Sequence, residues 1–147
     1  WRIIAALLSH KPVGTKTDAR GALQFFRRVA RRHTICFFIS DFLGDGFQEA
    51  LRATAIRHEI VAIRVLDGLE KRTPAGALMN FEDLESGVRA GFDLGGARDL
   101  VGEGERERHG KLTREFGAQG IDYLELMSSE DTVENLLRFF IQREKKR

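Results

Sequence analysis

The sequence contains one cysteine among its 147 residues, and this scarcity excludes several kinds of site. A single thiol cannot form an internal disulfide, and no cysteine or histidine cluster has the spacing of a zinc site. Cys36 lies inside an apolar stretch, where a free cysteine is most simply a small buried hydrophobic residue and not a nucleophile. The sequence therefore indicates neither a disulfide-stapled fold nor a zinc-bound one.

The sequence also lacks a long hydrophobic run and an excess of one charge. No apolar stretch approaches the roughly 18 residues that a membrane-spanning helix needs. Residues 1–8 carry neither a basic leader nor a cleavage site, so we expect a cytoplasmic segment without a membrane span. The formal net charge of +2 gives no compositional reason to expect nucleic-acid binding. A hydrophobic content of 42% in a chain of this length indicates one domain, 1–147, with a real core. Because the chain opens on Trp1, without Met, we expect it to be an internal piece of a longer protein.

A short apolar stretch, 34–39, is the feature around which the other elements are arranged. It is rich in β-branched and aromatic residues, which is typical of a strand buried on both faces of a parallel sheet. Ser40 and Asp41 follow at once. Ligands of open α/β sheets bind beyond the carboxyl ends of the strands, so Asp41 is the strongest functional candidate. The alternative is that Asp41 only opens a turn or caps a helix.

Hydrophobic periodicity predicts an α/β fold with parallel strands at 34–39, 59–66 and 121–126 and helices above and below the sheet. A strand, a helix and a second strand form one right-handed crossover, so the first two strands are expected to be parallel neighbours. Alternating apolar residues around the turn signal Glu85-Ser86-Gly87 predict a β-hairpin near 77–94.

Amphipathic helices are expected between the strands, each with a polar residue at its start. One helix ends near residue 10, and the next is capped by Thr17. Asp45 begins a third helix, with Gln48 completing a capping box, and Ser128 or Ser129 caps the last.

Several charged residues are best explained as solvated. The basic cluster of Arg27, Arg28, Arg31, Arg32 and His33 suits the end of a helix, where the dipole favours cations. His58 is expected to be an exposed histidine at a helix end. The run 105–109 in the charged segment 97–117 is expected to be the solvated face of a partly exposed helix.

Two segments resemble the metal-site motifs of von Willebrand factor A-like domains. Thr17 stands five residues before the pair Ala22-Leu23, as in the second motif, and Ile39-Ser40-Asp41 matches a third motif in which a strand ends in Ser-Asp. The stretch 57–65, then Asp67 and Glu70, then 83–87, resembles the MoxR-associated branch, known as domain-of-unknown-function family fifty-eight. The resemblance covers nearly the whole chain.

The resemblance implies a Rossmann-like three-layer sandwich whose sheet carries a metal-ion-dependent adhesion site. In such sites an Asp-x-Ser-x-Ser loop, a threonine and an aspartate hold Mg²⁺ or Mn²⁺, and an acidic group of a partner completes the shell. Thr17 and Asp41 are the ligands carried over, with Lys16, Asp18 and Asp67 at the partner surface.

One departure from the family pattern is large, because no Asp-x-Ser-x-Ser sequence occurs in the chain. The resemblance therefore implies the carboxyl-terminal part of such a domain, without its first motif, and weak or absent metal binding. Strand 34–39 would then lack a neighbour and present an apolar edge, which predicts a homodimer.

The resemblance implies a non-enzymatic protein-binding module that acts with a MoxR-type AAA+ ATPase in the maturation of protein complexes. One alternative is a structural domain without a metal site. Another is a magnesium-dependent phosphoryl-transfer enzyme in which Asp41, Asp67 and Asp83 gather at the strand ends.

Overall fold

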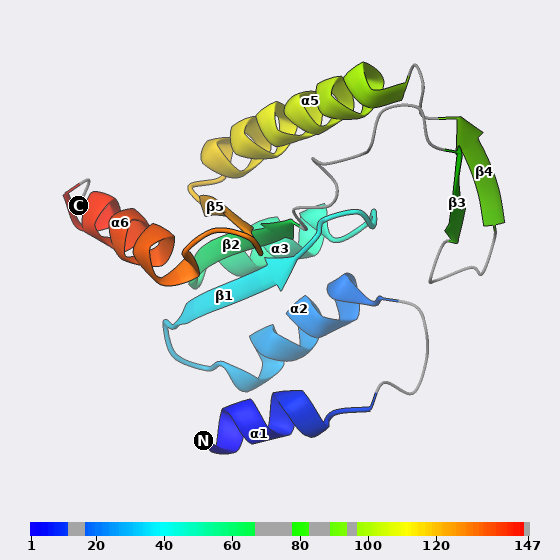
Figure 1. Ribbon diagram of the computed structural model, residues 1–147. Helices are drawn as coiled ribbons and strands as arrows, with labels where there is room; N and C mark the ends of the chain where they lie inside the picture. Colours follow the sequence, from blue (N-terminus) through cyan, green and yellow to red (C-terminus); the bar gives the residue numbers. More distant parts are fainter. Residues whose placement is uncertain (12–16, 67–77, 83–88, 94–96, 146–147) are drawn as a thin grey trace.

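A three-stranded parallel sheet forms the centre of the fold. The computed structural model describes residues 1–11, 17–66, 78–82, 89–93 and 97–145 (Figure 1). The strands are β1 (Ile35–Ser40), β2 (Glu59–Leu66) and β5 (Asp122–Met127), in the order β1-β2-β5. Both pairings are parallel, which confirms the predicted α/β class. The first and third strands begin one residue later than predicted.

Helices cover both faces of this sheet. On one face, α2 (Ala19–Val29), α3 (Gln48–Ala55) and α5 (Ala97–Ala118) enclose a core built around β2. On the other face, α6 (Thr132–Lys145) packs Leu136 and Phe139 near Val61, Ile63 and Leu126. Alternate residues of a strand point to opposite faces, so the continuous apolar sequence of β2 supplies both cores. The three-layer arrangement follows from that alternation.

Three helix starts differ from the sequence prediction. Asp18, not Thr17, is the N-cap of α2, and its Oδ1 accepts a hydrogen bond from Gly21 N at 2.8 Å. Asp45 lies before α3, which begins at Gln48 without a side-chain cap. Asp131 begins α6 in place of either predicted serine, since its Oδ1 accepts bonds from the backbone N–H groups of residues 133 and 134. At the starts of α2 and α6 several capping residues stand close together, and the sequence does not select among them.

The glycines of α5 do not interrupt it, and the predicted charged helix extends over 22 residues. Leu112 and Phe116 are buried and anchor the second half of the helix. Gly120 has φ +67°, a backbone conformation that L side chains rarely adopt, and the chain reverses there into β5.

The two remaining parts stand apart from the parallel sheet. The predicted hairpin is confirmed as β3 (Leu78–Glu82) paired antiparallel with β4 (Arg89–Asp93), which form a sheet of their own; the predicted turn 85–87 lies outside the described residues. Helix α1 (Arg2–Ser9) has no buried residue, and Figure 1 shows it on the side of α2 away from the sheet. No described helix combines the length and apolar character needed to cross a bilayer.

His58 is buried and not exposed at a helix end as the sequence suggested. Only 4% of its surface is accessible, and its ring meets Phe26 edge-on at 5.0 Å between centroids. Neither ring nitrogen has a hydrogen-bond partner among the described residues. Burial, followed by the nearby cations Arg57, His33 and Arg27, lowers the pKa of His58. The neutral ring is therefore the form that fits the fold.

We predict that the free energy of unfolding decreases as the pH falls from 7.5 toward 5.5. The unfolded state gains a proton on His58 near pH 6.5, whereas the folded state, with its lower pKa, resists protonation. For one proton the slope is at most about 1.4 kcal/mol per pH unit. Urea unfolding across this range tests the prediction. His58→Leu should flatten the curve, and His10→Leu, which removes an exposed histidine, should leave it unchanged; equal slopes in all three proteins would contradict the assignment.

Candidate functional site

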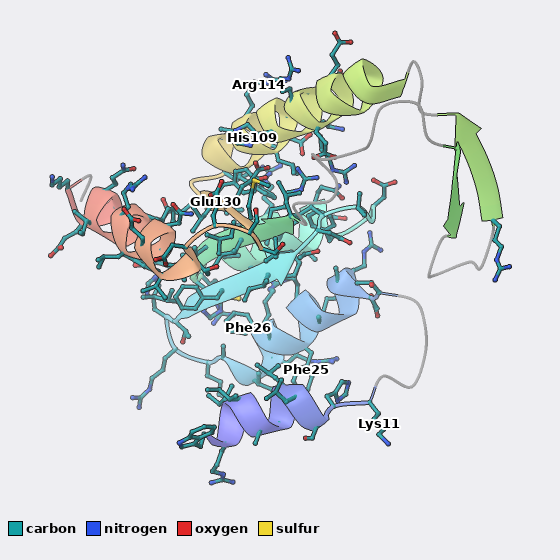
Figure 2. The ribbon with its side chains drawn as sticks, in the orientation of Figure 1. Lys11, Phe25, Phe26, His109, Arg114 and Glu130 are labelled. Atoms are coloured by element: carbon teal, nitrogen blue, oxygen red, sulfur yellow. The ribbon has the colours of Figure 1, made fainter. Side chains whose placement is uncertain are left out.

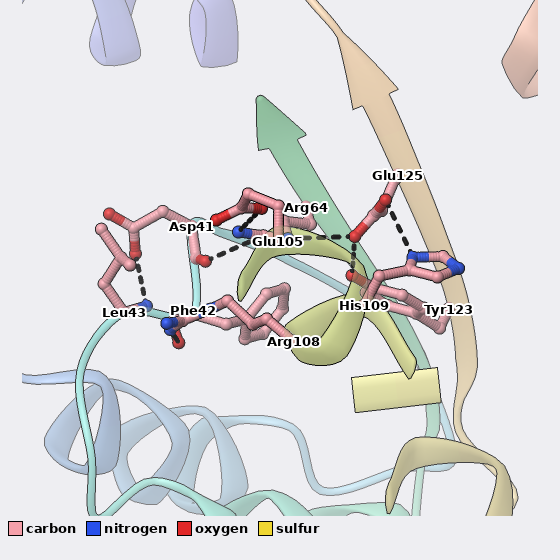
Figure 3. Close-up of polar contacts among 9 residues, drawn as sticks. All are labelled: Asp41, Phe42, Leu43, Arg64, Glu105, Arg108, His109, Tyr123 and Glu125. Carbon is pink, nitrogen blue, oxygen red and sulfur yellow. Dashed lines mark hydrogen bonds and ion pairs between the residues drawn. The ribbon is translucent and has the colours of Figure 1, made fainter. Parts of the chain in front are cut away.

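Asp41 lies at the carboxyl edge of the sheet, directly after β1, with an exposed side chain (Figure 3). Its Oδ1 accepts a hydrogen bond from Leu43 N at 3.0 Å, and Ser40 Oγ lies 3.4 Å from the same oxygen. Ser40 Oγ in turn accepts a bond from Phe42 N at 3.0 Å. The Ser-Asp pair therefore forms a local turn that fixes the direction of the carboxylate.

Phe42, the next residue, is strained. Its φ is +56°, which is uncommon for any residue except glycine, and bulky side chains pay for it with about 1–3 kcal/mol. The ring is buried among Phe38, Phe47, Phe116 and Tyr123, and its carbonyl accepts a bond from Arg108 of α5. Surrounding contacts thus hold the turn in a conformation that the local sequence does not favour.

Arg64 of β2 connects this turn to the rest of the sheet. Its side chain is 2% exposed, and the parallel register places it between Ser40 of β1 and Glu125 of β5. Arg64 Nε donates to the Asp41 carbonyl at 3.2 Å. The two terminal nitrogens bind Glu125 at 3.1 Å and Glu105 of α5 at 2.9 Å. One guanidinium of β2 therefore joins the turn after β1 to β5 and α5.

Glu125 is the second centre of this network. Besides Arg64, it accepts a bond from the Tyr123 hydroxyl at 2.5 Å and contacts His109 Nδ1 at 2.9 Å. Burial acts to raise the pKa of Glu125, but the bonds from Tyr123, His109 and Arg64 outweigh it and the pKa is lowered. Burial, followed by the bond to Glu125, raises the pKa of Tyr123, so this phenol stays protonated. The network is a charged cluster whose members satisfy one another.

The sequence interpretation missed most of these residues. The run 105–109 was expected to be solvated, yet Glu105, Arg108 and His109 all reach the sheet or its carboxyl edge. One signal was available: Arg64 interrupts the otherwise apolar strand 60–66. A cation in a doubly buried strand requires a buried partner.

The other site residues of the prediction are only partly described. Thr17 is exposed and precedes the cap of α2, and Asp18, the cap itself, is exposed as well. Lys16, Asp67 and Asp83 lie outside the described residues, so the predicted partner surface and the gathering of three carboxylates stay predictions.

The turn at Asp41 offers few of the oxygen ligands that a magnesium site needs. Mg²⁺ takes six oxygen ligands, keeps several waters and often binds one or two carboxylates. Among the described residues, no group of three or more His, Cys, Asp or Glu side chains could hold a metal ion. Asp41 supplies one carboxylate and Ser40 one hydroxyl. These donors suit a hydrated, weakly held ion and do not form a closed cage.

A shallow groove of about 380 Å³ lies next to the turn, between loop 42–48 and α5. Its charged lining has both signs, with Asp45 on the loop and Glu107, Arg108 and Lys111 on α5. The groove is open and polar, which suits a protein surface better than a small apolar ligand.

Comparison with known proteins identifies the family. Residues 1–103 match the family described as "Protein of unknown function DUF58". The chain belongs to the DUF58 family.

Named relatives of this DUF58 chain are uncharacterised mycobacterial proteins. One from Mycobacterium bovis and one from Mycobacterium tuberculosis are each 32% identical over 140 residues, which is 94% of this chain and 44% of the relative. A Mycobacterium avium protein is 32% identical over 130 residues, covering 87% of this chain and 77% of the relative. The chain thus spans less than half the length of the first two relatives. No solved structure matches it.

We predict that Arg64→Met destabilises the fold by about 3 kcal/mol or more, because it leaves two partly buried carboxylates without their cation. Adding Glu105→Gln and Glu125→Gln should recover much of the loss, since the unpaired charges are then removed. Urea unfolding measures both effects. Arg138→Met, which breaks the exposed pair with Glu134, should cost less than about 1 kcal/mol. Equal losses in Arg64→Met and Arg138→Met would show that the network carries no stability.

Proposed function

We propose that this DUF58 chain is a non-enzymatic protein-binding module whose contact point is the Asp41 turn. The observation that carries the proposal is an exposed carboxylate at the carboxyl edge of a parallel sheet, held by a strained turn that four elements support. Strained backbone that persists because its surroundings fix it is concentrated at functional sites. Ligands of open α/β sheets bind at this edge.

The proposal includes a divalent cation at this edge, as in the adhesion sites of von Willebrand factor A-like domains. Asp41 and Thr17 would be its protein ligands, Mg²⁺ or Mn²⁺ the ion, and an acidic side chain of the partner a further ligand. Hard oxygen ligands suit these ions, and an ion with few protein ligands leaves positions for water or a partner. Because no group of three or more His, Cys, Asp or Glu side chains gathers among the described residues, this chain alone should bind the ion weakly.

The proposed partner is a MoxR-type AAA+ ATPase system that acts in the maturation of protein complexes in the cytoplasm. This choice rests on the resemblance of the stretches 57–65 and 83–87 to the MoxR-associated branch. The groove between loop 42–48 and α5 supports it physically, because an open surface with both charge signs suits a polar protein interface. Lys16, Asp18 and Asp67 are proposed to surround the contact.

We predict that Asp41→Ala weakens binding to a purified MoxR-type ATPase, encoded beside a gene of this family, by more than about tenfold in the presence of Mg²⁺. Surface plasmon resonance measures the affinity. The control is Glu144→Ala, which removes an equal charge at an exposed residue of α6 that does not line the groove. Chelation of the cation should weaken the wild-type protein to the level of Asp41→Ala.

Calorimetric titration with Mg²⁺ and Mn²⁺ separates the metal from the partner. Weak heat that Asp41→Ala abolishes supports the ion site. Partner binding that neither chelation nor Asp41→Ala affects would overturn the proposal of an ion site. If neither the ions nor the ATPase bind, the chain is a structural domain in which Asp41 is a turn residue.

We further propose that two copies of the chain associate through β1. This strand is the last in the described sheet order. Its residues Ile35, Phe37 and Ile39 lie on the same face of the sheet as α6, and all three stay exposed because that helix covers them only in part. An exposed apolar edge strand is a template for pairing with another chain. Phe37 meets Phe140 of α6 at 6.1 Å, so the apolar surface continues from the strand onto that helix.

We predict a species of twice the 16.6 kDa monomer mass at micromolar concentration, measured by light scattering after size exclusion. Ile39→Lys should shift the equilibrium to monomer, because it places a charge on the pairing strand. Ile56→Lys makes the same change at an exposed residue after α3 and should leave the dimer intact. A monomeric wild-type protein would refute this association.

A further inference from the structure

The amino edge of the sheet carries six exposed basic residues that no described acid neutralises. We name them the amino-edge cluster: Arg27, Arg28, Arg31, Arg32, His33 and Arg57. None takes part in an ion pair among the described residues. The acids at this edge, Glu59 and Asp122, are both bound by Arg143. On a chain whose net charge is only +2, this is a local excess of positive charge.

The helix dipole accounts for part of this cluster only. Helix α2 ends at Val29 and α3 at Ala55, so Arg27 and Arg28 lie in a last turn. The other four residues follow the helix ends, and the dipole effect falls off within the last turn. Their gathering results from the parallel sheet, which brings the loops before β1 and β2 to the same edge; Glu59 N donates to Thr34 O there at 3.1 Å.

An exposed apolar surface adjoins the cluster. On α2, Phe25 and Val29 are more than half exposed, and the Arg28 guanidinium lies 5.9 Å from the centre of the Phe25 ring. Figure 2 shows Phe25 in the space between α2 and α1. Helix α1 places Ile3, Ile4, Leu7 and Leu8 on one face, with exposed fractions from 52% to 83%. Basic residues stand at both ends of the helix, Arg2 and Lys11.

An amphipathic helix with large aliphatic side chains beside a group of four to eight arginines is the pattern that recognises an anionic bilayer surface. The apolar face enters the boundary between headgroups and acyl chains, and the guanidinium groups bind lipid phosphates. Single-stranded nucleic acid would instead require a series of aromatic rings spaced for base stacking, whereas the ring that lies under an arginine of the cluster is the single ring of Phe25. The aliphatic face of α1 would also gain nothing from a nucleic acid.

We propose that α1 and the amino-edge cluster form a peripheral binding surface for anionic membranes. Helix α1 lies in the plane of the interface and inserts Ile3, Ile4, Leu7 and Leu8, while the cluster contacts the phosphates. The surface lies at the edge of the sheet opposite Asp41, so the carboxyl edge stays open to a protein partner. The proposal does not depend on the metal site or on the ATPase.

Co-sedimentation with vesicles tests this surface. The wild-type chain should bind vesicles that mix phosphatidylglycerol with phosphatidylcholine, and high salt should abolish that binding. It should not bind vesicles of pure phosphatidylcholine. Arg31→Gln with Arg32→Gln should lower the partition coefficient by about tenfold or more, because each arginine near an anionic membrane surface adds to the free energy of membrane binding. Leu7→Ser with Leu8→Ser should also lower it, because the inserted apolar area is lost.

The matched control removes two charges elsewhere. Lys111→Gln with Arg138→Gln changes residues on α5 and α6 and should stay within about twofold of wild type. Circular dichroism verifies that each variant is folded. Failure of the wild type to sediment with phosphatidylglycerol vesicles, or equal losses in the cluster and control variants, would overturn the proposal. Tight binding of an oligonucleotide that depends on Arg31 and Arg32, with no vesicle binding, would assign the cluster to nucleic acid instead.

Discussion

The burial of one guanidinium group sets the arrangement at the carboxyl edge of the sheet. Arg64 is 2% exposed, and a cation in that position is tolerated only because two carboxylates and the Asp41 carbonyl surround it. These partners belong to the turn after β1, to β5 and to α5, so the contacts that offset the desolvation cost of this one side chain also fix three other parts of the fold. The long, glycine-containing helix α5 is thereby tied to the sheet at its centre, while Leu112 and Phe116 anchor its second half.

The same contacts explain how a strained turn can persist next to an exposed acid. Phe42 keeps a positive φ because its ring fills an aromatic core and its amide and carbonyl groups are both bound. Asp41 is therefore presented by a rigid support, although its own side chain is solvated. A residue that is held on a fixed scaffold loses little conformational entropy when it contacts a partner, and this small entropy cost raises the affinity.

The two edges of the sheet differ in chemistry. At the carboxyl edge, charges of both signs neutralise one another in a hydrogen-bonded cluster, and one carboxylate points outward. At the amino edge, the six basic side chains of the amino-edge cluster stay solvated beside exposed apolar helices. Parallel strands create this polarity because all their starts meet at one edge and all their ends at the other. The surfaces that we propose for a protein and for a membrane therefore lie at opposite edges of one small fold.

The sequence by itself determined the kind and order of the elements, since alternation and helical periodicity are local properties of consecutive residues. Those patterns located the three parallel strands, the hairpin and the apolar faces of the helices, and they placed Asp41 after the first strand. The tertiary structure alone decided the inward approach of Glu105, Arg108 and His109, the register that sets Arg64 between Ser40 and Glu125, and the burial of His58. Each of these depends on pairing between residues far apart in the chain; Arg64 and Glu125 are separated by 61 positions. A local sequence pattern does not predict such a long-range pairing. The ion-pair partners are selected by packing and desolvation once the elements are in contact.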